Sequence, residues 1–212
     1  MINDGQFSLV LTDNDIISKL AHWRLLESLT SAFNCSISQI YTLPSLVIRA
    51  RKAIEKPDQL FRDSETASYA YAFLKQLSVQ VAPDPQTVAD LQQNPNIDYG
   101  EALLIAIALT ENKSLIATGD KRAIASIGGL QAKGQLLELR GRIVCLEQLL
   151  NCFTQLLSFS VVQKCIKNLP DIDRATKAIW GSRIDSPEES VYEGMYSYIN
   201  SLKSSAPALL IE

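Results

Sequence analysis

The sequence twice runs an apolar stretch directly into an acidic residue, as Leu9-Val10-Leu11-Thr12-Asp13 and as Leu115-Ile116-Ala117-Thr118-Gly119-Asp120. Both stretches have the length and composition of a buried strand. Between them, Asp98-Tyr99-Gly100-Glu101 opens a long run that is apolar on all sides, which is typical of an enclosed helix. If the two strands are parallel neighbours, their carboxyl ends lie at the same edge of the sheet, and we expect the acids to converge there.

Strand-like and helix-like stretches alternate over the first two thirds of the chain. We expect strands at 8–12, 36–43, 79–81, 114–118 and 143–146. Helices are expected at 16–29, from 44, at 65–77, at 86–92, from 98, and at 120–127, where Gly128-Gly129 should end the last one. This order predicts an α/β fold, a three-layer α/β/α sandwich with a mostly parallel sheet.

The remainder of the chain shows only helical patterns. Helices are expected at about 147–158, 160–168, 171–180 and 187–203. We therefore predict an α/β domain over 1–146 and an all-helical extension over 147–212. The composition of the extension fits a substrate-recognition module and a partner-binding module equally well.

Composition excludes several classes of protein. The chain of 212 residues has a net charge of −3, so it lacks the basic surface of a non-specific nucleic-acid coat. No apolar run is long enough to span a bilayer, and the amino terminus lacks the basic-then-apolar order of a secretory signal. We predict a cytoplasmic protein that does not enter the membrane. The single histidine, His22, cannot build a histidine-rich metal site.

Each acid also has a purely structural interpretation. Asp98 and Glu101 have the spacing of a capping box, and Asp120 can cap the helix that begins at Lys121. Asp15 can cap a helix that begins at Ile16, which leaves Asp13 without an obvious structural role. Acids at three successive entries to one sheet edge therefore favour a shared site over three independent caps.

The predicted cluster points to a hard metal ion. Carboxylates that lie close together repel one another unless a cation neutralises them. Oxygen ligands without a usable histidine select Mg²⁺ or Mn²⁺ over zinc. Waters on such an ion supply the hydroxide for attack on phosphorus, so phosphodiester hydrolysis is the leading chemistry.

The same motifs resemble PIN-domain proteins, many of which are metal-dependent ribonucleases and toxins of toxin–antitoxin pairs. The resemblance covers roughly residues 8–146 and is carried by Leu9-Val10-Leu11-Thr12-Asp13-Asn14-Asp15, Asp98-Tyr99-Gly100-Glu101-Ala102 and the stretch from Leu115 to Arg122. It implies catalysis and metal ligation by Asp13, Glu101 and Asp120, with Asp15 and Asp98 as supporting ligands. It also implies an RNA substrate, a protein inhibitor or antitoxin as partner, and a homodimer.

One departure from the family pattern bears on activity. PIN nucleases commonly carry another acid on the helix after the second strand, about where this chain has Arg49. An arginine cannot ligate Mg²⁺ but pairs well with phosphate. We expect a phosphate-binding role for the basic residues of this region and of the second motif, namely Arg49, Arg51, Lys121 and Arg122.

Two alternatives stay open beside the ribonuclease. The arginine is also compatible with a PIN-like scaffold that binds RNA or a protein without cutting. Asp13-Asn14-Asp15 also satisfies the D-x-D motif of haloacid dehalogenase-like phosphatases, in which the first acid is a nucleophile. That family usually places a further acid shortly after the late Gly-Asp, and Lys121-Arg122-Ala123-Ile124-Ala125 supplies none.

Overall fold

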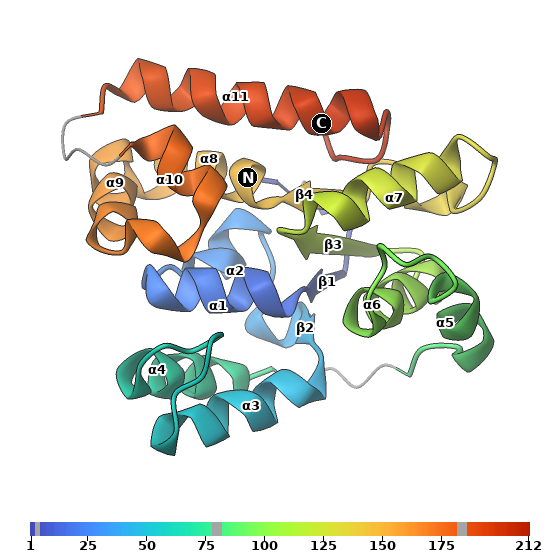
Figure 1. Cartoon of the computed structure of the whole chain (residues 1–212), viewed down its shortest axis with the longest axis horizontal. Coiled ribbons are helices and arrows are strands. Elements are labelled where there is room, and N and C mark those ends of the chain that lie inside the picture. Colours follow the sequence, from blue (N-terminus) through green and yellow to red (C-terminus); the bar gives the residue numbers. More distant parts are fainter. Residues whose placement is uncertain (3–4, 78–81, 182–185) are drawn as a thin grey trace.

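The computed structural model describes residues 1–2, 5–77, 82–181 and 186–212 (Figure 1). Within this part the chain forms a four-stranded sheet of β1 (Leu9–Thr12), β2 (Ile40–Thr42), β3 (Ser114–Thr118) and β4 (Ile143–Cys145), in the order β2-β1-β3-β4. All the pairings are parallel, so the predicted parallel sheet is confirmed. The strands that end in acids, β1 and β3, are central neighbours with Thr12 paired to Ala117.

Helices connect and surround the strands. Their bounds are α1 Asn14–His22, α2 Ser28–Ala32, α3 Pro44–Glu55, α4 Ser64–Leu74, α5 Pro85–Leu91, α6 Tyr99–Thr110, α7 Lys121–Gln131, α8 Leu146–Leu157, α9 Phe159–Asn168, α10 Arg174–Trp180 and α11 Glu188–Ser205. None of the described helices is long and apolar enough to cross a membrane.

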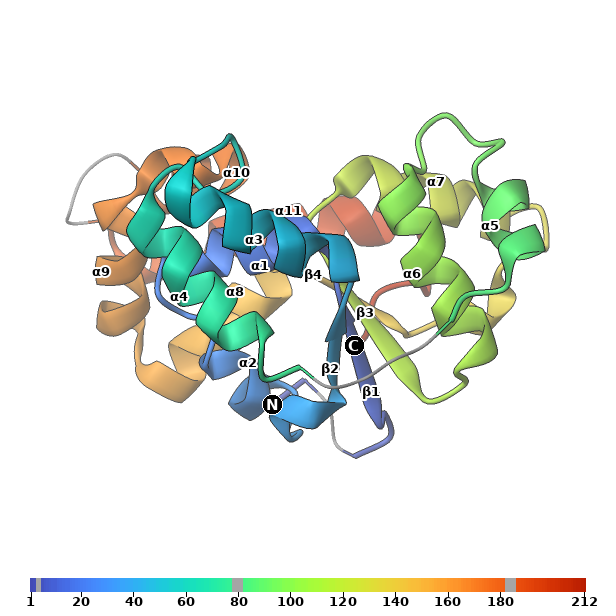
Figure 2. The same cartoon turned by 90° about the horizontal axis from the view of Figure 1, so that it is seen from below.

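The strands bury alternate side chains on opposite faces of the sheet. Val10, Leu115 and Val144 belong to one hydrophobic cluster, whereas Leu11 and Ile116 belong to the other. Figure 2 shows the corresponding helices, with α1, α3, α4 and α8 on one side of the strands and α6 and α7 on the other. Because both faces are covered, the strands read as continuous apolar runs in the sequence.

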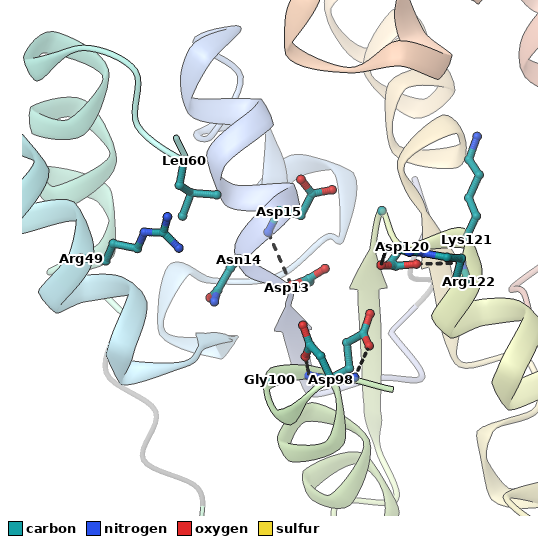
Figure 3. Close-up of a pocket in the computed structure, with 12 residues that line it drawn as sticks. Asp13, Asn14, Asp15, Arg49, Leu60, Asp98, Gly100, Asp120, Lys121 and Arg122 are labelled. Atoms are coloured by element: carbon teal, nitrogen blue, oxygen red, sulfur yellow. Dashed lines mark hydrogen bonds and ion pairs between the residues drawn. The ribbon is translucent and has the colours of Figure 1, made fainter. Parts of the chain in front are cut away.

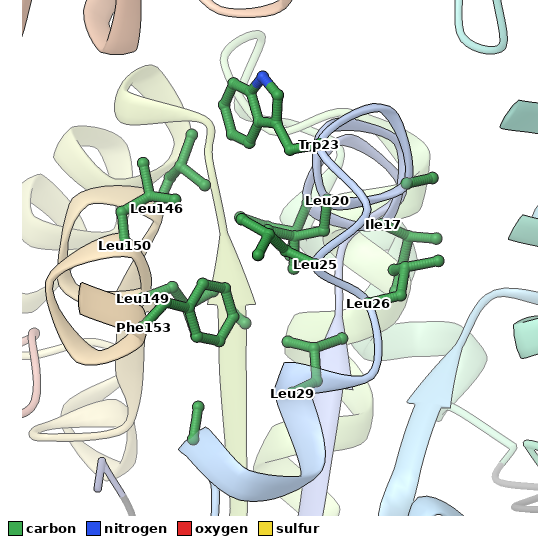
Figure 4. Close-up of a cluster of buried hydrophobic side chains, with 14 of the residues drawn as sticks. Ile17, Leu20, Trp23, Leu25, Leu26, Leu29, Leu146, Leu149, Leu150 and Phe153 are labelled. Carbon is green, nitrogen blue, oxygen red and sulfur yellow. The ribbon is translucent and has the colours of Figure 1, made fainter. Parts of the chain in front are cut away.

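The helices after residue 146 pack into the same core. Leu149 and Phe153 of α8 face Leu20 and Leu29 of α1 and α2 (Figure 4), and all four side chains are fully buried. Near the carboxyl end, Leu210 forms a bridge alongside Ile143 of β4. Apolar packing is therefore continuous from the strands into the predicted extension.

The helix expected over 16–29 is wrong in its extent, because α1 ends at His22 and a separate short helix, α2, begins at Ser28. Arg24 adopts a left-handed conformation with φ 58°, and the Leu25 N–H bonds to the Leu20 carbonyl at 2.8 Å. This is the hydrogen-bonding pattern of a Schellman helix ending. It turns the chain so that Trp23, Leu25 and Leu26 are all buried.

Two further boundaries differ from the prediction. The strand expected over 36–43 is confined to β2, because Ile37–Gln39 forms a 3₁₀ turn held by the capping box of Ser36. Helix α7 does not stop at Gly128-Gly129 but continues to Gln131. A Cβ on Gly128 would lie 2.6 Å from Cβ of Ala206, so this glycine serves a close approach of chain segments and not a helix end. The strand expected over 79–81 lies outside the described residues.

The carboxyl-terminal helices follow the predicted ranges closely, with one exception. The helix expected over 171–180 begins only at Arg174, because Pro170–Ile172 forms a 3₁₀ turn. Asp173 caps the helix by accepting a hydrogen bond from the Thr176 N–H at 2.7 Å. This cap brings an acid of the extension close to the edge of the sheet, where it contacts α1.

Candidate functional site

An open cleft of about 500 Å³ lies at the carboxyl edge of the sheet, beyond the ends of β1 and β3 (Figure 3). Helices α1, α6 and α7 all begin at this edge, since each follows or precedes one of the strands. The cleft brings all five predicted acids together. Its lining consists of Asp13, Asn14, Asp15, Arg49, Leu60, Asp98, Gly100, Glu101, Gly119, Asp120, Lys121 and Arg122.

Asp13 is the N-cap of α1, so the cap that we expected from Asp15 is wrong. Its contact with the Asp15 N–H is long, at 3.5 Å. The Thr118 hydroxyl donates to the other oxygen of Asp13 at 3.2 Å and accepts the Asp120 N–H at 3.1 Å. A single threonine thus joins the ends of β1 and β3 and fixes the spacing of Asp13 and Asp120.

The capping interpretation of the other acids is confirmed. Asp98 and Glu101 form a capping box, in which each carboxylate accepts the other residue's backbone N–H at 2.8 Å. Asp120 caps α7 by accepting the N–H groups of Arg122 and Ala123 at 2.7 and 3.1 Å. Convergence and capping therefore coexist: the caps orient the carboxylates, and the sheet edge brings them to one cleft.

Burial and mutual repulsion hold two of the cleft acids in an unusual electrostatic state. Burial raises the pKa of Asp13 from 3.8 to about 6, and the charges of Asp15 and Asp98 add to the rise. Burial also raises the pKa of Glu101 from 4.5 to about 7. The charges of Asp98, Asp120 and Asp13 contribute further to the pKa of Glu101, which shows that these acids act on one another.

Asp15 lies at the cleft but is already paired. Its carboxylate forms an ion pair with Lys19 one turn further along α1, and Lys19 also contacts Asp173 at 2.7 Å. Burial alone would lower the pKa of Lys19, but the two carboxylates hold it above its ordinary value. Gly119 leaves room for this pair, because a Cβ there would lie 2.6 Å from the Asp15 carboxylate.

The four basic residues predicted to bind RNA have different surroundings. Arg49 lines one wall of the cleft and pairs with Asp58 at 2.5 Å, whereas Arg122 lies across the cleft from it with 85% of its side chain exposed (Figure 3). The Lys121 side chain points away from the acids of the cleft (Figure 3). Arg51 is exposed on α3 but does not line the cleft.

Lys121 is held by the helices that follow β4. Its ammonium lies 2.7 Å from Glu147 of α8, a carboxylate that is only 1% exposed, and 3.8 Å from the centre of the Tyr198 ring of α11. The contact with Glu147 is a charge pair without aligned hydrogen-bond geometry. Both partners attract the Lys121 ammonium: Glu147 by ion pairing and Tyr198 by cation–π attraction.

The oxygen donors of the cleft suit Mg²⁺ or Mn²⁺ better than zinc, since neither histidine nor cysteine lines it. Asp98, Glu101 and Asp120 each commit one oxygen to a helix cap and keep the second. As the side chains are placed, no group of three acids, histidines or cysteines among the described residues could hold a metal ion. Ligation would require the second oxygens to turn toward one another.

Sequence reasoning did not identify three residues that shape the site. Asn14 lines the cleft with a buried side-chain oxygen that has no hydrogen-bond partner among the described residues. Lys19 could have been found from its helical spacing to Asp15. Asp173 carried no local signal, because it lies far from Lys19 in the sequence.

No protein-family model, no curated protein and no solved structure matches this chain. The functional assignment therefore depends on the geometry and electrostatics of the cleft.

Proposed function

We propose that the protein hydrolyses phosphodiester bonds of RNA with Mg²⁺ or Mn²⁺ as cofactor, as a PIN-like nuclease. The observation that supports this most strongly is the set of acids at one sheet edge, in which Asp13 and Glu101 have raised pKa values and no lysine or arginine partner in the described part of the chain. Such strain is common at functional sites. The proposal includes a three-layer α/β/α arrangement around the sheet.

Asp13, Glu101 and Asp120 would hold the metal, with Asp98 supporting Glu101 through the capping box. When bound, the ion supplies neutralising charge and a hydroxide at neutral pH. The residues of the chain do the rest. Thr118 keeps Asp13 and Asp120 at a fixed separation, and the capping box binds one oxygen each of Asp98 and Glu101 to backbone N–H groups.

Arg49 and Arg122 suit the phosphates on either side of the scissile bond. They lie on opposite walls of the cleft, so an extended backbone that crosses the acids would meet a guanidinium on each side (Figure 3). Guanidinium groups bind phosphate oxygens bidentately. Arg49 then positions the substrate phosphate and does not ligate the metal. Its guanidinium would leave Asp58 when the substrate binds.

A second candidate function, a scaffold that binds RNA without cutting it, is favoured by one observation. Every cleft acid except Asp15 already serves a helix cap, so the acids have a structural use without any metal. The two functions differ in a single measurable property, which is metal-dependent cleavage.

The test is cleavage of single-stranded and structured RNA by the purified protein, with Mg²⁺, with Mn²⁺ and with chelator. Asp13→Asn and Asp120→Asn should each lower the rate by about 100-fold or more, since each removes a ligand that stabilises the transition state. Asp84→Asn is a matched control, because Asp84 also caps a helix but lies outside the cleft.

Three outcomes separate the candidates. Cleavage that needs metal and is lost in both cleft variants supports the nuclease. RNA binding without cleavage supports the scaffold. Release of phosphate from a small aryl phosphate, without RNA cleavage, would instead support a phosphatase that uses Asp13 as nucleophile.

A further inference from the structure

A second pocket of about 480 Å³ adjoins the acidic cleft. It lies at the end of β2, where α3 begins, and against the first three turns of α6. Asn14, Ser45 and Asp98 also line it, but most of its walls are aromatic and aliphatic. The side chains that form them include Tyr41, Leu43, Pro44, Tyr99, Leu103 and Ile107.

Three residues line both cavities, namely Asn14, Asp98 and Gly100. Figure 3 labels all three in the acidic cleft. Gly100 keeps their junction open. A Cβ at this position would lie 3.2 Å from Leu43 and 3.3 Å from the Asp98 carboxylate, so even a methyl group would crowd the passage. The apolar pocket and the acidic cleft therefore share a boundary, and a ligand that crosses it would occupy both.

Two features show which kind of ligand suits the pocket. Tyr99 is 60% exposed at the first turn of α6, which leaves an aromatic ring available for stacking beside the acids. The side-chain oxygen of Asn14 is buried and has no hydrogen-bond partner among the described residues. A flat, largely apolar group would stack on the exposed ring, and an N–H donor on it would pair with the Asn14 oxygen once that side chain turns into the pocket.

We infer that this pocket is a nucleobase subsite, which receives one unstacked base of single-stranded RNA while the adjoining phosphodiester lies over the acids. This inference rests on the proposed function and narrows its substrate class. A base in a duplex is paired and stacked, so it cannot enter. Aromatic side chains commonly stack bases of single strands, and side-chain amides hydrogen-bond their exposed edges.

The test uses a hexaribonucleotide with a central 2-aminopurine, whose fluorescence reports stacking. It is titrated in Mg²⁺ into the Asp120→Asn protein, so that the strand stays intact. Replacing Tyr99 by Ala in this background should weaken binding by about 5- to 150-fold, the range for loss of one base–aromatic stack. Tyr99→Phe should retain the affinity. The corresponding duplex should bind weakly and should not respond to either change.

Gly100→Ala provides a second variant that is expected to fold, because alanine is the better helix former. It should lower affinity and reduce the 2-aminopurine response by narrowing the junction. Arg49→Ala is the matched control in the cleft: it should weaken binding but leave the response at saturation unchanged, since it removes a phosphate contact and not a base contact.

Two results would overturn the inference, and they are distinguishable. If Tyr99→Ala and Gly100→Ala bind the strand as well as their parent, the subsite is wrong, while metal-dependent cleavage by the wild type would leave the proposed function intact. If the wild type neither binds nor cleaves any single strand, the proposed function fails and the subsite fails with it.

Discussion

Two groups of acids lie near the same sheet edge in opposite electrostatic environments. Asp13 and Glu101 face other carboxylates, and burial and repulsion raise their pKa values to about 6 and about 7. Asp173 is also buried, which alone would raise its pKa, yet the Lys19 ammonium holds that pKa below its usual range. Glu147 is still more buried and is paired with Lys121.

The difference distinguishes structural acids from candidate functional ones. A buried acid with a lysine partner has its charge compensated within the fold. A buried acid among other acids lowers the stability of the metal-free protein, and only a proton or an external cation can compensate it. The lysine-paired acids Asp173 and Glu147 join the carboxyl-terminal helices to the sheet edge, whereas Asp13 and Glu101 line the open cleft.

The largest loss of stability is expected when a buried acid loses its lysine partner. Lys121→Met should destabilise the protein by about 3 kcal/mol, because Glu147 is left as an uncompensated charge in the interior. Urea denaturation at pH 8 measures this loss. The double variant Lys121→Met/Glu147→Leu should recover most of it, since both charges are gone. A loss well below ~1 kcal/mol in the single variant would show that the pair behaves like an exposed one.

Metal addition should compensate the unpaired acids. Wild type should gain stability with Mg²⁺ by about 2.7 kcal/mol at a concentration 100 times the dissociation constant, through preferential binding to the folded state. Thermal melts over a Mg²⁺ series measure the gain. Asp13→Asn should gain clearly less, whereas Asp84→Asn should respond like wild type. A wild-type melting temperature that does not change with Mg²⁺ would mean that the acids are only helix caps.

Removing one unpaired charge should stabilise the protein, whereas breaking a buried pair should destabilise it. Glu101→Gln keeps the capping box but deletes the charge, so in chelator at pH 8 it should stabilise the protein by roughly 1–2 kcal/mol. Glu188→Gln, in the first turn of α11 and outside the cleft, controls for the loss of a charge near a helix amino terminus. Destabilisation of Glu101→Gln relative to this control would contradict the unfavourable environment of Glu101.

The same acid contributes to the pH dependence of stability. Its folded-state pKa is raised from 4.5 to about 7, so the folded protein binds the proton more tightly than the unfolded chain. The associated stability is fully present below about pH 4.5 and is lost as the pH rises through about 7. In chelator, the free energy of unfolding of wild type should therefore fall between pH 5 and pH 8 relative to that of Glu101→Gln. If the free energies of unfolding of wild type and Glu101→Gln change in parallel with pH, Glu101 does not have a raised pKa in the folded protein.

The smallest expected effect concerns an exposed pair. Lys177 contacts Asp171 at 2.6 Å, but 44% and 71% of the two side chains are exposed. Lys177→Met should leave the melting temperature unchanged within error, because solvent and salt screen such pairs. A clear drop in melting temperature would mean that burial does not explain the difference in stability between the exposed Lys177–Asp171 pair and the buried Lys121–Glu147 pair.

The sequence by itself determined the parallel sheet, the strands that end in Asp13 and Asp120, and the capping box of Asp98 and Glu101. These features depend on the local hydrophobic period and on spacings of a few residues. Contacts between residues close in the sequence are enough to set them. The same local reasoning failed where distant parts of the chain decide the conformation. Gly128 lies within α7 because Ala206 packs against it, and α1 ends early because the core takes up Trp23 and Leu25.

Only the tertiary structure decided which acids are compensated. Asp15 and Asp13 are only two residues apart in the sequence, but Asp15 shares Lys19 with Asp173 of the carboxyl-terminal part. Lys121 lines the cleft, but Glu147 and Tyr198 hold its ammonium. The physical reason is that a charge pair and a pKa depend on distance and burial, and both are set by chain segments far apart in the sequence.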